Sequence, residues 1–405
     1  MSAIRPFTID VNNETLDWIT HRVKTAKIPS DITHPEGHEW DDGMPSSVLE
    51  DLKNFWSTQY DWRQVEARLN STFKMFKVEL TEGDETIDLH FVHHRSPRED
   101  AVPLIFAHGW PGNFTEVKSL LSLTDPSDPK QQAFHIVAPT IPGFVFSSAA
   151  KRPGFSIARI ARVYHKLMVT LGYKHYVAQG GDWGSFILRS VAIQYPEAVV
   201  GLHINFPAAP IPSPLKNPIT LFWLAIGWLT PEEKKRINRI KWFFEEESGY
   251  SKIQGTKPQT ISHALLDSPI GMLAWIREKI NAGVEPDYVW DKEEVITWTI
   301  LYLLADSAGA ARIYKAANAK TLAEEVLNPK ISRQVAFGIS SFPQEIAYMT
   351  RWWAEACVAE NITYWKMHDK GGHFPAVEVP DRLLEDILGF VKSIPVERRS
   401  LLSGQ

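Results

Sequence analysis

The pattern of apolar and polar positions changes near residue 100 of the chain. From Val102 onward, short unbroken apolar runs alternate with segments in which apolar residues recur every three or four positions. The runs predict strands over Val102–His108, His135–Pro139, Tyr176–Gln179 and Gly201–Asn205, and the segments predict helices over Ser156–Leu171 and Ser185–Gln194. Strands without a polar face that alternate with helices are typical of a parallel sheet covered by helices on both sides. We therefore expect an α/β core that starts near residue 101.

The alternation stops after Asn205 and returns near residue 330. Residues 206–328 are rich in proline and then helical in pattern, without a clear strand, so we expect an inserted helical lid. Strands are predicted again at Gln334–Ser340 and Ile362–His368, and a last helix at Arg382–Ser393. The expected core therefore has two parts, 101–205 and 329–405.

The first 100 residues do not share this rhythm. Short helices are predicted at Asn13–Thr25, Ser46–Trp56 and Asp61–Asn70, and two strands at Phe73–Leu80 and Thr86–Arg95. The stretch between the first two helices is rich in Pro, Asp, Gly and His, which favours a loop. We interpret residues 1–100 as an extension that wraps around the rest of the molecule.

Composition excludes several classes of protein. The formal net charge of the 405 residues is -5, so no broad basic face for nucleic acid is expected. The single cysteine, Cys357, permits no intramolecular disulfide and no thiolate metal cluster. No secretory signal is visible, and the longest apolar run, Ile219–Leu229, is about half the roughly 20 residues that span a bilayer. We expect a cytoplasmic protein without a membrane anchor and interpret the run as a pocket-facing or lid helix, with a helix bound at a membrane surface as the alternative.

The strongest local motif is Gly180-Gly181-Asp182-Trp183-Gly184, between a predicted strand and a predicted helix. A nucleophile in so tight a turn needs small residues two positions before and two positions after it, and Gly180 and Gly184 meet that need. The segment lacks the G-x-G-x-x-G pattern of dinucleotide-binding turns, while an aspartate that only caps the helix is the structural alternative. A carboxylate nucleophile forms an ester with the carbon that it attacks. Asp182 therefore indicates epoxides or alkyl halides as substrates.

A base and its partner are expected from the second half of the core. His373 lies in Gly371-Gly372-His373-Phe374, after the last predicted strand, and is predicted to activate a water molecule. Glu345 follows the preceding strand and is predicted to orient His373, with Asp369 as the reserve.

A third motif, His108-Gly109-Trp110-Pro111-Gly112, ends the first core strand. Turns at this position supply a backbone N–H to an oxyanion hole, which we assign to Trp110, and the residue after the nucleophile, Trp183, supplies the second. These residues already provide nucleophile, base and acid, so no metal or organic cofactor is expected.

Together these segments resemble the microsomal-type epoxide hydrolases of the α/β-hydrolase fold, including their soluble fungal members. The resemblance covers nearly the whole chain and includes Pro6–Ile9, Asp61–Arg63, His108–Gly112, Gln179–Ser185, Ser248–Tyr250 and Gly371–Phe374. It implies a mostly parallel central sheet flanked by helices, an inserted helical lid and a wrapping N-terminal segment. It also implies that epoxides are converted to vicinal diols through an ester on Asp182.

The same resemblance implies the roles of two lid tyrosines. Tyr250 and Tyr314 match the pair that donates hydrogen bonds to the epoxide oxygen, and Tyr302 is the candidate if Tyr314 is wrong. A phenol, with a reference pKa of about 10, can donate a proton to the alkoxide that ring opening produces. The family's acid matches Glu345. The membrane-bound members carry an N-terminal anchor helix that this chain lacks, so a soluble location is implied.

Two other functions are alternatives to epoxide hydrolysis. A haloalkane dehalogenase shares the aspartate and histidine and often a tryptophan like Trp183, but a halide site does not need the tyrosine pair. A ligand-binding protein without activity would need a broken triad, whereas Asp182, His373 and Glu345 are all present. The expected substrates are water and a small apolar epoxide, held by the lid aromatics Trp223, Trp228, Trp242 and Phe243. A homodimer is common in such folds. Detoxification, epoxide catabolism and a biosynthetic step are the roles that this chemistry allows.

Overall fold

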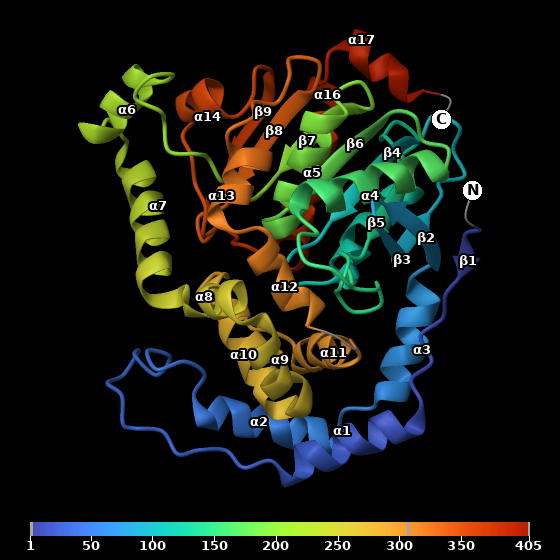
Figure 1. The fold of residues 1–405 in the computed structure, drawn as a ribbon, viewed down its shortest axis with the longest axis vertical. Helices are drawn as coiled ribbons and strands as arrows, with labels where there is room; N and C mark the ends of the chain where they lie inside the picture. The colour runs from blue at the N-terminus through green and yellow to red at the C-terminus, as the bar shows by residue number, and fades with distance from the viewer. Residues whose placement is uncertain (1–2, 306–307, 404–405) are drawn as a thin grey trace.

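The computed structural model describes residues 3–305 and 308–403. Within them, one nine-stranded sheet has the order β1-β2-β3-β5-β4-β6-β7-β8-β9 (Figure 1). From β5 to β9 the neighbouring strands are parallel, while β1, β2 and β3 extend the sheet with antiparallel pairs. The strands are β1 (Arg5–Pro6), β2 (Met75–Glu82), β3 (Glu85–His94), β4 (Val102–Ala107), β5 (Phe134–Pro139), β6 (Tyr176–Gly180), β7 (Val199–Ile204), β8 (Ala336–Ser341) and β9 (Ile362–Met367).

The central strands have no polar face because helices cover both sides of the sheet. Every residue of β4, β5, β6, β7 and β8 is buried. Helices α4 (Ile157–Thr170) and α5 (Asp182–Gln194) pack together on one face, and η1 (Phe114–Thr124) and α16 (Pro380–Ser393) pack together on the other. The predicted α/β-hydrolase fold is confirmed, although the 3₁₀ helix η1 was not predicted from the sequence.

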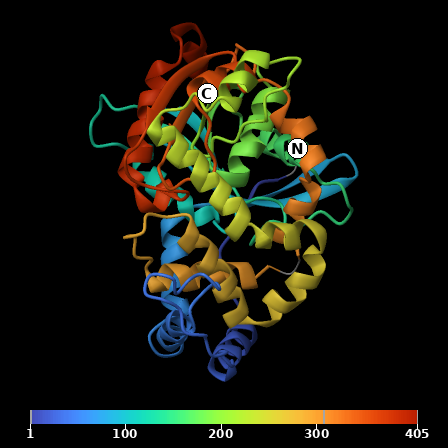
Figure 2. The ribbon, with the colours of Figure 1, turned by 90° about the vertical axis from the view of Figure 1, so that its left-hand side faces the viewer.

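The N-terminal segment runs from the edge of the sheet to the far side of the lid and back (Figures 1 and 2). Helices α1 (Asn13–Thr25) and α2 (Ser46–Thr58) pack on the lid helices α10 (Pro269–Ala282) and α11 (Lys292–Leu303), and α3 (Trp62–Thr72) leads back to β2. The buried carboxylate of Glu66 accepts hydrogen bonds from the Val11 backbone at 2.8 Å and the Trp62 indole at 3.0 Å. This carboxylate ties the extended chain before α1 to α3.

All elements between β7 and β8 in the described residues are helical. They are α6 (Pro218–Ala225), α7 (Pro231–Trp242), the π-helical turn η2 (Phe243–Glu247), α8 (Gly249–Thr256), α9 (Pro258–Asp267), α10, α11, α12 (Gly309–Ala316), α13 (Ala319–Leu322) and the π-helical turn η3 (Ala323–Leu327). Helix α7 is anchored to the core by the buried side chain of Arg236, which donates to the Ser341 hydroxyl at 3.0 Å and the His368 carbonyl at 2.9 Å. The core then continues through α14 (Arg351–Cys357), α15 (Pro375–Glu378), α16, α17 (Val396–Arg399) and η4 (Ser400–Leu402).

The long apolar run is a lid helix, but it does not face a pocket. Helix α6 lies at the periphery (Figure 1), where Ile219 is 65% exposed and Phe222 is 58% exposed. Of the two interpretations of this run, the position of α6 between β7 and β8 fits the lid helix, and its exposure does not fit a pocket-facing one, because hydrophobicity alone does not tell on which side of the lid a helix lies. None of the helices in residues 3–305 and 308–403 combines the length and the apolar character that crossing a bilayer requires.

Strand register brings the predicted motifs to one edge of the sheet. Ala107 of β4 pairs with Gly180 of β6, so the turns that follow these two strands lie side by side. Ser341 of β8 pairs with Met367 of β9, so the loops that follow these two strands also lie side by side. These loops carry Glu345 and His373. The carboxyl ends of parallel strands are where α/β proteins place their ligand sites.

Replacement of Gly184 by alanine tests the packing of α5 on β4. A Cβ atom at Gly184 would overlap the Ala107 carbonyl, so α5 would have to move away from the strand. We expect the free energy of unfolding to fall by about 3 kcal/mol, the upper part of the range for overpacked cores, in urea titrations. Gly249→Ala is the control, because a Cβ atom there meets no atom within 4 Å. Equal stability of the two variants would contradict the expectation.

Candidate active site

Asp182 lies at the sharp turn between β6 and α5. It is the first residue of the helix and has φ +43°, a left-handed conformation that a residue with a side chain adopts only under constraint. Glycines surround it because there is no room for side chains: a Cβ at Gly109 would overlap the Asp182 carboxylate, and one at Gly184 would overlap β4. This geometry is that of a nucleophile elbow, and it points the carboxylate at the turn after β4.

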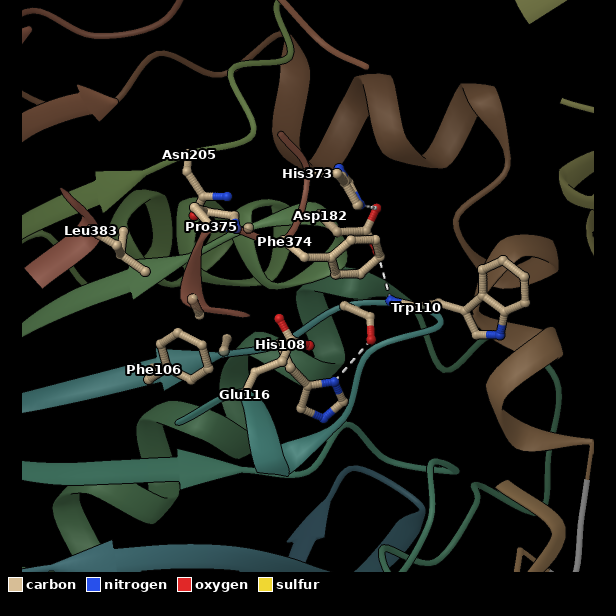
Figure 3. A pocket seen from close by; sticks show the side chains of 14 residues that line it. Phe106, His108, Trp110, Glu116, Asp182, Asn205, His373, Phe374, Pro375 and Leu383 are labelled. Carbon is tan, nitrogen blue, oxygen red and sulfur yellow. Dashed lines mark hydrogen bonds and ion pairs between the residues drawn. The ribbon is translucent and has the colours of Figure 1, made fainter. Parts of the chain in front are cut away.

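One peptide group holds the Asp182 carboxylate from the β4 side. The Trp110 N–H donates to Asp182 Oδ1 at 2.8 Å (Figure 3). The carbonyl of the same peptide, Gly109 O, lies 3.0 Å from His108 Nδ1, while the Ile141 N–H donates to His108 Nε2 at 3.3 Å. Nε2 therefore accepts and Nδ1 donates, and burial lowers the pKa of His108 to about 4, which keeps the ring neutral. His108 thus fixes the orientation of the Trp110 N–H.

The second predicted oxyanion donor is placed differently. The backbone of Trp183 follows Asp182 in the first turn of α5. Among the hydrogen bonds of the described residues, Trp110 donates to the Asp182 carboxylate and the Trp183 N–H does not. The role of the Trp183 N–H in the oxyanion hole therefore stays a prediction.

His373 lies between two carboxylates. Its Nε2 is 3.5 Å from Asp182 Oδ2, and its Nδ1 is 2.7 Å from Glu345 Oε1. Glu345 is 2% exposed and comes from the loop after β8. The backbone N–H of His373 donates to the Gly283 carbonyl of the lid at 2.7 Å. The structure thus joins Asp182, His373 and Glu345 in one chain of contacts, whereas the reserve acid Asp369 is 88% exposed and pairs with Arg382.

The charges around His373 decide its protonation. Burial lowers the pKa of His373, but Glu345 and Asp182 favour the imidazolium and together hold this pKa well above its usual value. The ring is therefore positively charged between two negative carboxylates at neutral pH. Loss of either negative charge would lower the pKa of His373 again.

The two lid tyrosines pack on Trp110, in the turn after β4, and on Trp183, in the turn after β6. Tyr250 of α8 stacks on Trp110 with ring centroids 4.8 Å apart, and Tyr314 of α12 meets Trp183 edge-to-face at 4.8 Å. The two tyrosine rings are 5.7 Å apart. Burial raises the pKa of both phenols above its usual value, and the negative charge of Asp182 adds to this for both, after the effect of Tyr250 in the case of Tyr314. Both phenols are therefore protonated, and the charge of the Asp182 carboxylate acts on both.

Helix α12 reaches this position through a contact between two glycines. Gly309, at the start of the helix, packs so closely on Gly143 of the core that a Cβ on either would overlap the other residue. Tyr302, the reserve candidate, lies elsewhere: its hydroxyl donates to the Gly112 carbonyl at 2.7 Å. The hydroxyl hydrogen of Tyr302 is therefore engaged in a hydrogen bond to the backbone.

The aromatic residues predicted to line a pocket lie mostly at the surface. Trp223, Trp228 and Trp242 are 37%, 65% and 39% exposed, and of the four only Phe243 is buried. The aromatics around the histidine are instead Phe206 and Phe374, whose ring centroids are 5.6 Å and 4.8 Å from that of His373. Lid aromatics do not predict the pocket lining, because the packing of the lid helices decides whether an aromatic side chain faces the site or the solvent.

A small cavity adjoins the Asp182 carboxylate, and two of its polar residues were not singled out from the sequence. It is lined by Asp182, His373, Asn205 and Glu116 together with backbone and apolar groups (Figure 3). Burial raises the pKa of the Glu116 carboxyl to about 8. The available signal in the sequence is one acidic residue four positions after Gly112, in a stretch of mixed polar and apolar residues, which is too weak to indicate a site.

Comparisons with known proteins agree with this geometry. Residues 4–117 match the family model described as the epoxide hydrolase N terminus, and residues 102–237 match that of the alpha/beta hydrolase fold. Juvenile hormone epoxide hydrolase 2 of Ctenocephalides felis is 35% identical, over 96% of this chain and 86% of its own.

Solved structures agree as well. The epoxide hydrolase of Aspergillus niger has a TM-score of 0.82 at 32% identity, over 97% of both chains. Juvenile hormone epoxide hydrolase of Bombyx mori has a TM-score of 0.87 at 28% identity, over 99% of this chain and 96% of its own. The chain therefore belongs to the epoxide hydrolase family of the α/β-hydrolase fold, and it is an epoxide hydrolase.

Proposed function

We propose that this epoxide hydrolase forms vicinal diols through a covalent ester on Asp182. His373, oriented by Glu345, activates the water that hydrolyses the ester, and Tyr250 and Tyr314 bind the epoxide oxygen. The observation that carries the proposal is that two protonated, partly buried tyrosines pack on Trp110 and Trp183, beside a carboxylate that is fixed at an elbow. Water and a small epoxide are the substrates that this arrangement suits.

The first step uses the Asp182 oxygen that faces His373. Oδ1 accepts the Trp110 N–H, so Oδ2 attacks a ring carbon of the epoxide. A C–O bond forms to Asp182 as the ring C–O bond breaks, and the oxygen of the ring takes a proton from a tyrosine. Transfer of the His373 proton to the phenolate balances the charges and leaves a neutral imidazole.

Formation of the ester changes the pKa of His373 in the direction that hydrolysis requires. Esterified Asp182 has no negative charge, so one of the two carboxylates that favour the imidazolium is lost and the pKa of His373 falls. Neutral His373 can then accept a proton from water while the water oxygen attacks Cγ of Asp182. The Trp110 N–H stabilises the charge that develops on Oδ1. Collapse of this intermediate releases the diol, which takes the proton from His373. The remaining proton of the water then passes from the Asp182 carboxyl to His373, which restores the carboxylate and the imidazolium.

His373→Gln should separate the two steps. Glutamine cannot accept the proton of the water, so the ester should accumulate after mixing with a small epoxide. Intact-protein mass spectrometry should find an adduct with the full mass of the epoxide. The control is His21→Gln, an exposed histidine on α1, which should turn over without accumulating an adduct. If His373→Gln forms diol at the normal rate, the role of His373 is wrong.

Isotope labelling tests which atom the water attacks. With enzyme in excess over epoxide in ¹⁸O-water, the label should enter the carboxylate of Asp182, because the ester carbonyl is attacked. Tandem mass spectrometry of the peptide that contains Asp182 measures this, and the peptide that contains Glu345 is the unlabelled control. Label found in the diol alone would exclude the covalent ester.

Removal of both lid phenols tests the assignment of the tyrosines. The double variant Tyr250→Phe, Tyr314→Phe should form the Asp182 ester on the order of 1000-fold more slowly, since positioned acids contribute about 100-fold to 10,000-fold. Single-turnover rates measure the change. Tyr195→Phe is the control, because Tyr195 stacks on His165 away from the site with ring centroids 3.7 Å apart. Normal turnover by the double variant would mean that other groups protonate the alkoxide.

A further inference from the structure

The cavity beside Asp182 has the size and the lining of a water site. It leaves about 20 Å³ for the centre of a water molecule, and a site for one water needs roughly 10–15 Å³ in that measure. Neither Tyr250 nor Tyr314 lines it, so it lies on a different side of the carboxylate from the phenols. Figure 3 shows His373 and Glu116 approaching it from opposite sides.

Glu116 has a carboxyl oxygen that nothing in the protein satisfies. In the part of the chain that the structure describes, Oε1 is buried and has no hydrogen-bond partner, although the residue as a whole is only partly buried. The carboxyl lies in the space that a side chain at Gly112 would occupy, because a Cβ there would overlap Oε1. A buried acceptor without a partner is unfavourable, so its retention beside the site calls for a ligand.

The surroundings of Glu116 keep it neutral. Burial raises its pKa to about 8, with Asp182 and Glu294 acting in the same direction and with His373 and the Asn113 backbone opposing them. The phenol of Tyr302 also faces it. Below pH 8 the side chain is therefore mostly an uncharged acid.

We propose that Glu116 is the positioning residue for the water that hydrolyses the Asp182 ester, an inference that rests on the proposed function. Oε1 accepts one hydrogen of the water, and His373 Nε2 accepts the other. The amide oxygen of Asn205 accepts from Gln179 at 2.8 Å, which leaves the Asn205 amide N–H groups to donate to the water. These partners direct the remaining lone pair of the water toward Cγ of Asp182.

The neutral state of Glu116 matters for the charge that develops. Attack on the ester places a negative charge on Asp182 Oδ1, and an ionised Glu116 beside it would oppose that charge. Hydrolysis of the ester should therefore slow as the pH rises through the pKa of Glu116. The midpoint should lie at or above about 8, because formation of the ester removes the negative charge of Asp182, which raises this pKa, together with the positive charge of His373, which lowers it more.

Single-turnover kinetics with a small epoxide test the proposal, with rapid quenching and intact-protein mass spectrometry to follow the ester. In Glu116→Leu we expect hydrolysis of the ester to slow on the order of 100-fold, as for other misplaced reactants, while its formation stays within about threefold. Glu116→Gln keeps an uncharged acceptor, so it should hydrolyse the ester near the normal rate at pH 7 and lose the alkaline decline. Ser122→Leu, an exposed change on the same helix, is the control.

The outcomes are distinct. Normal ester hydrolysis in Glu116→Leu overturns the proposal. Equal slowing of both steps also overturns it, because Glu116 would then act through the Trp110 turn. An alkaline decline that persists in Glu116→Gln assigns the titration to another group and overturns the role of the neutral acid. If no ester forms on Asp182 even in His373→Gln, the proposed function itself fails.

Discussion

The hydrogen bond from the Trp110 N–H to the Asp182 carboxylate is the contact on which the rest of the site depends. It requires the turn after β4 to lie directly against the turn after β6, which parallel pairing of these strands provides. It also requires Gly109 and Gly184, since a side chain at either would separate the two turns. This packing holds the strained backbone of Asp182 and leaves its second carboxylate oxygen facing His373 Nε2 at 3.5 Å.

Electrostatics link this contact to the order of the proposed steps. His373 is held between Asp182 and Glu345, so its charge state depends on whether Asp182 is ionised. Formation of the ester would remove that charge and convert an acid into a base at the moment when a base is needed. The phenols of Tyr250 and Tyr314 and the carboxyl of Glu116 stay protonated for a different reason, which is burial. One low-dielectric site thus contains a histidine whose protonation is set mainly by neighbouring charges and three acids whose protonation is set mainly by burial.

Sequence reasoning succeeded where one local rule determines the structure. The strands β4 to β8 were predictable because burial on both faces demands unbroken apolar runs. The elbow was predictable because only glycine fits beside Asp182, and the place of His373 after the last strand followed from chain order. Tyr250 and Tyr314 came from family resemblance, since no local rule distinguishes a catalytic tyrosine from a packed one.

The sequence by itself determined the α/β core, the nucleophile elbow and the candidate residues Asp182, His373 and Glu345, because these follow from period, turn sterics and chain order. Tertiary structure alone decided which lid aromatics face inward, that α6 is exposed, and that Glu116 shares a cavity with Asp182 and His373. These features depend on how helices pack across long separations in the chain. An apolar helix has the same pattern whether it faces the site or the solvent, and a single glutamate has no pattern at all.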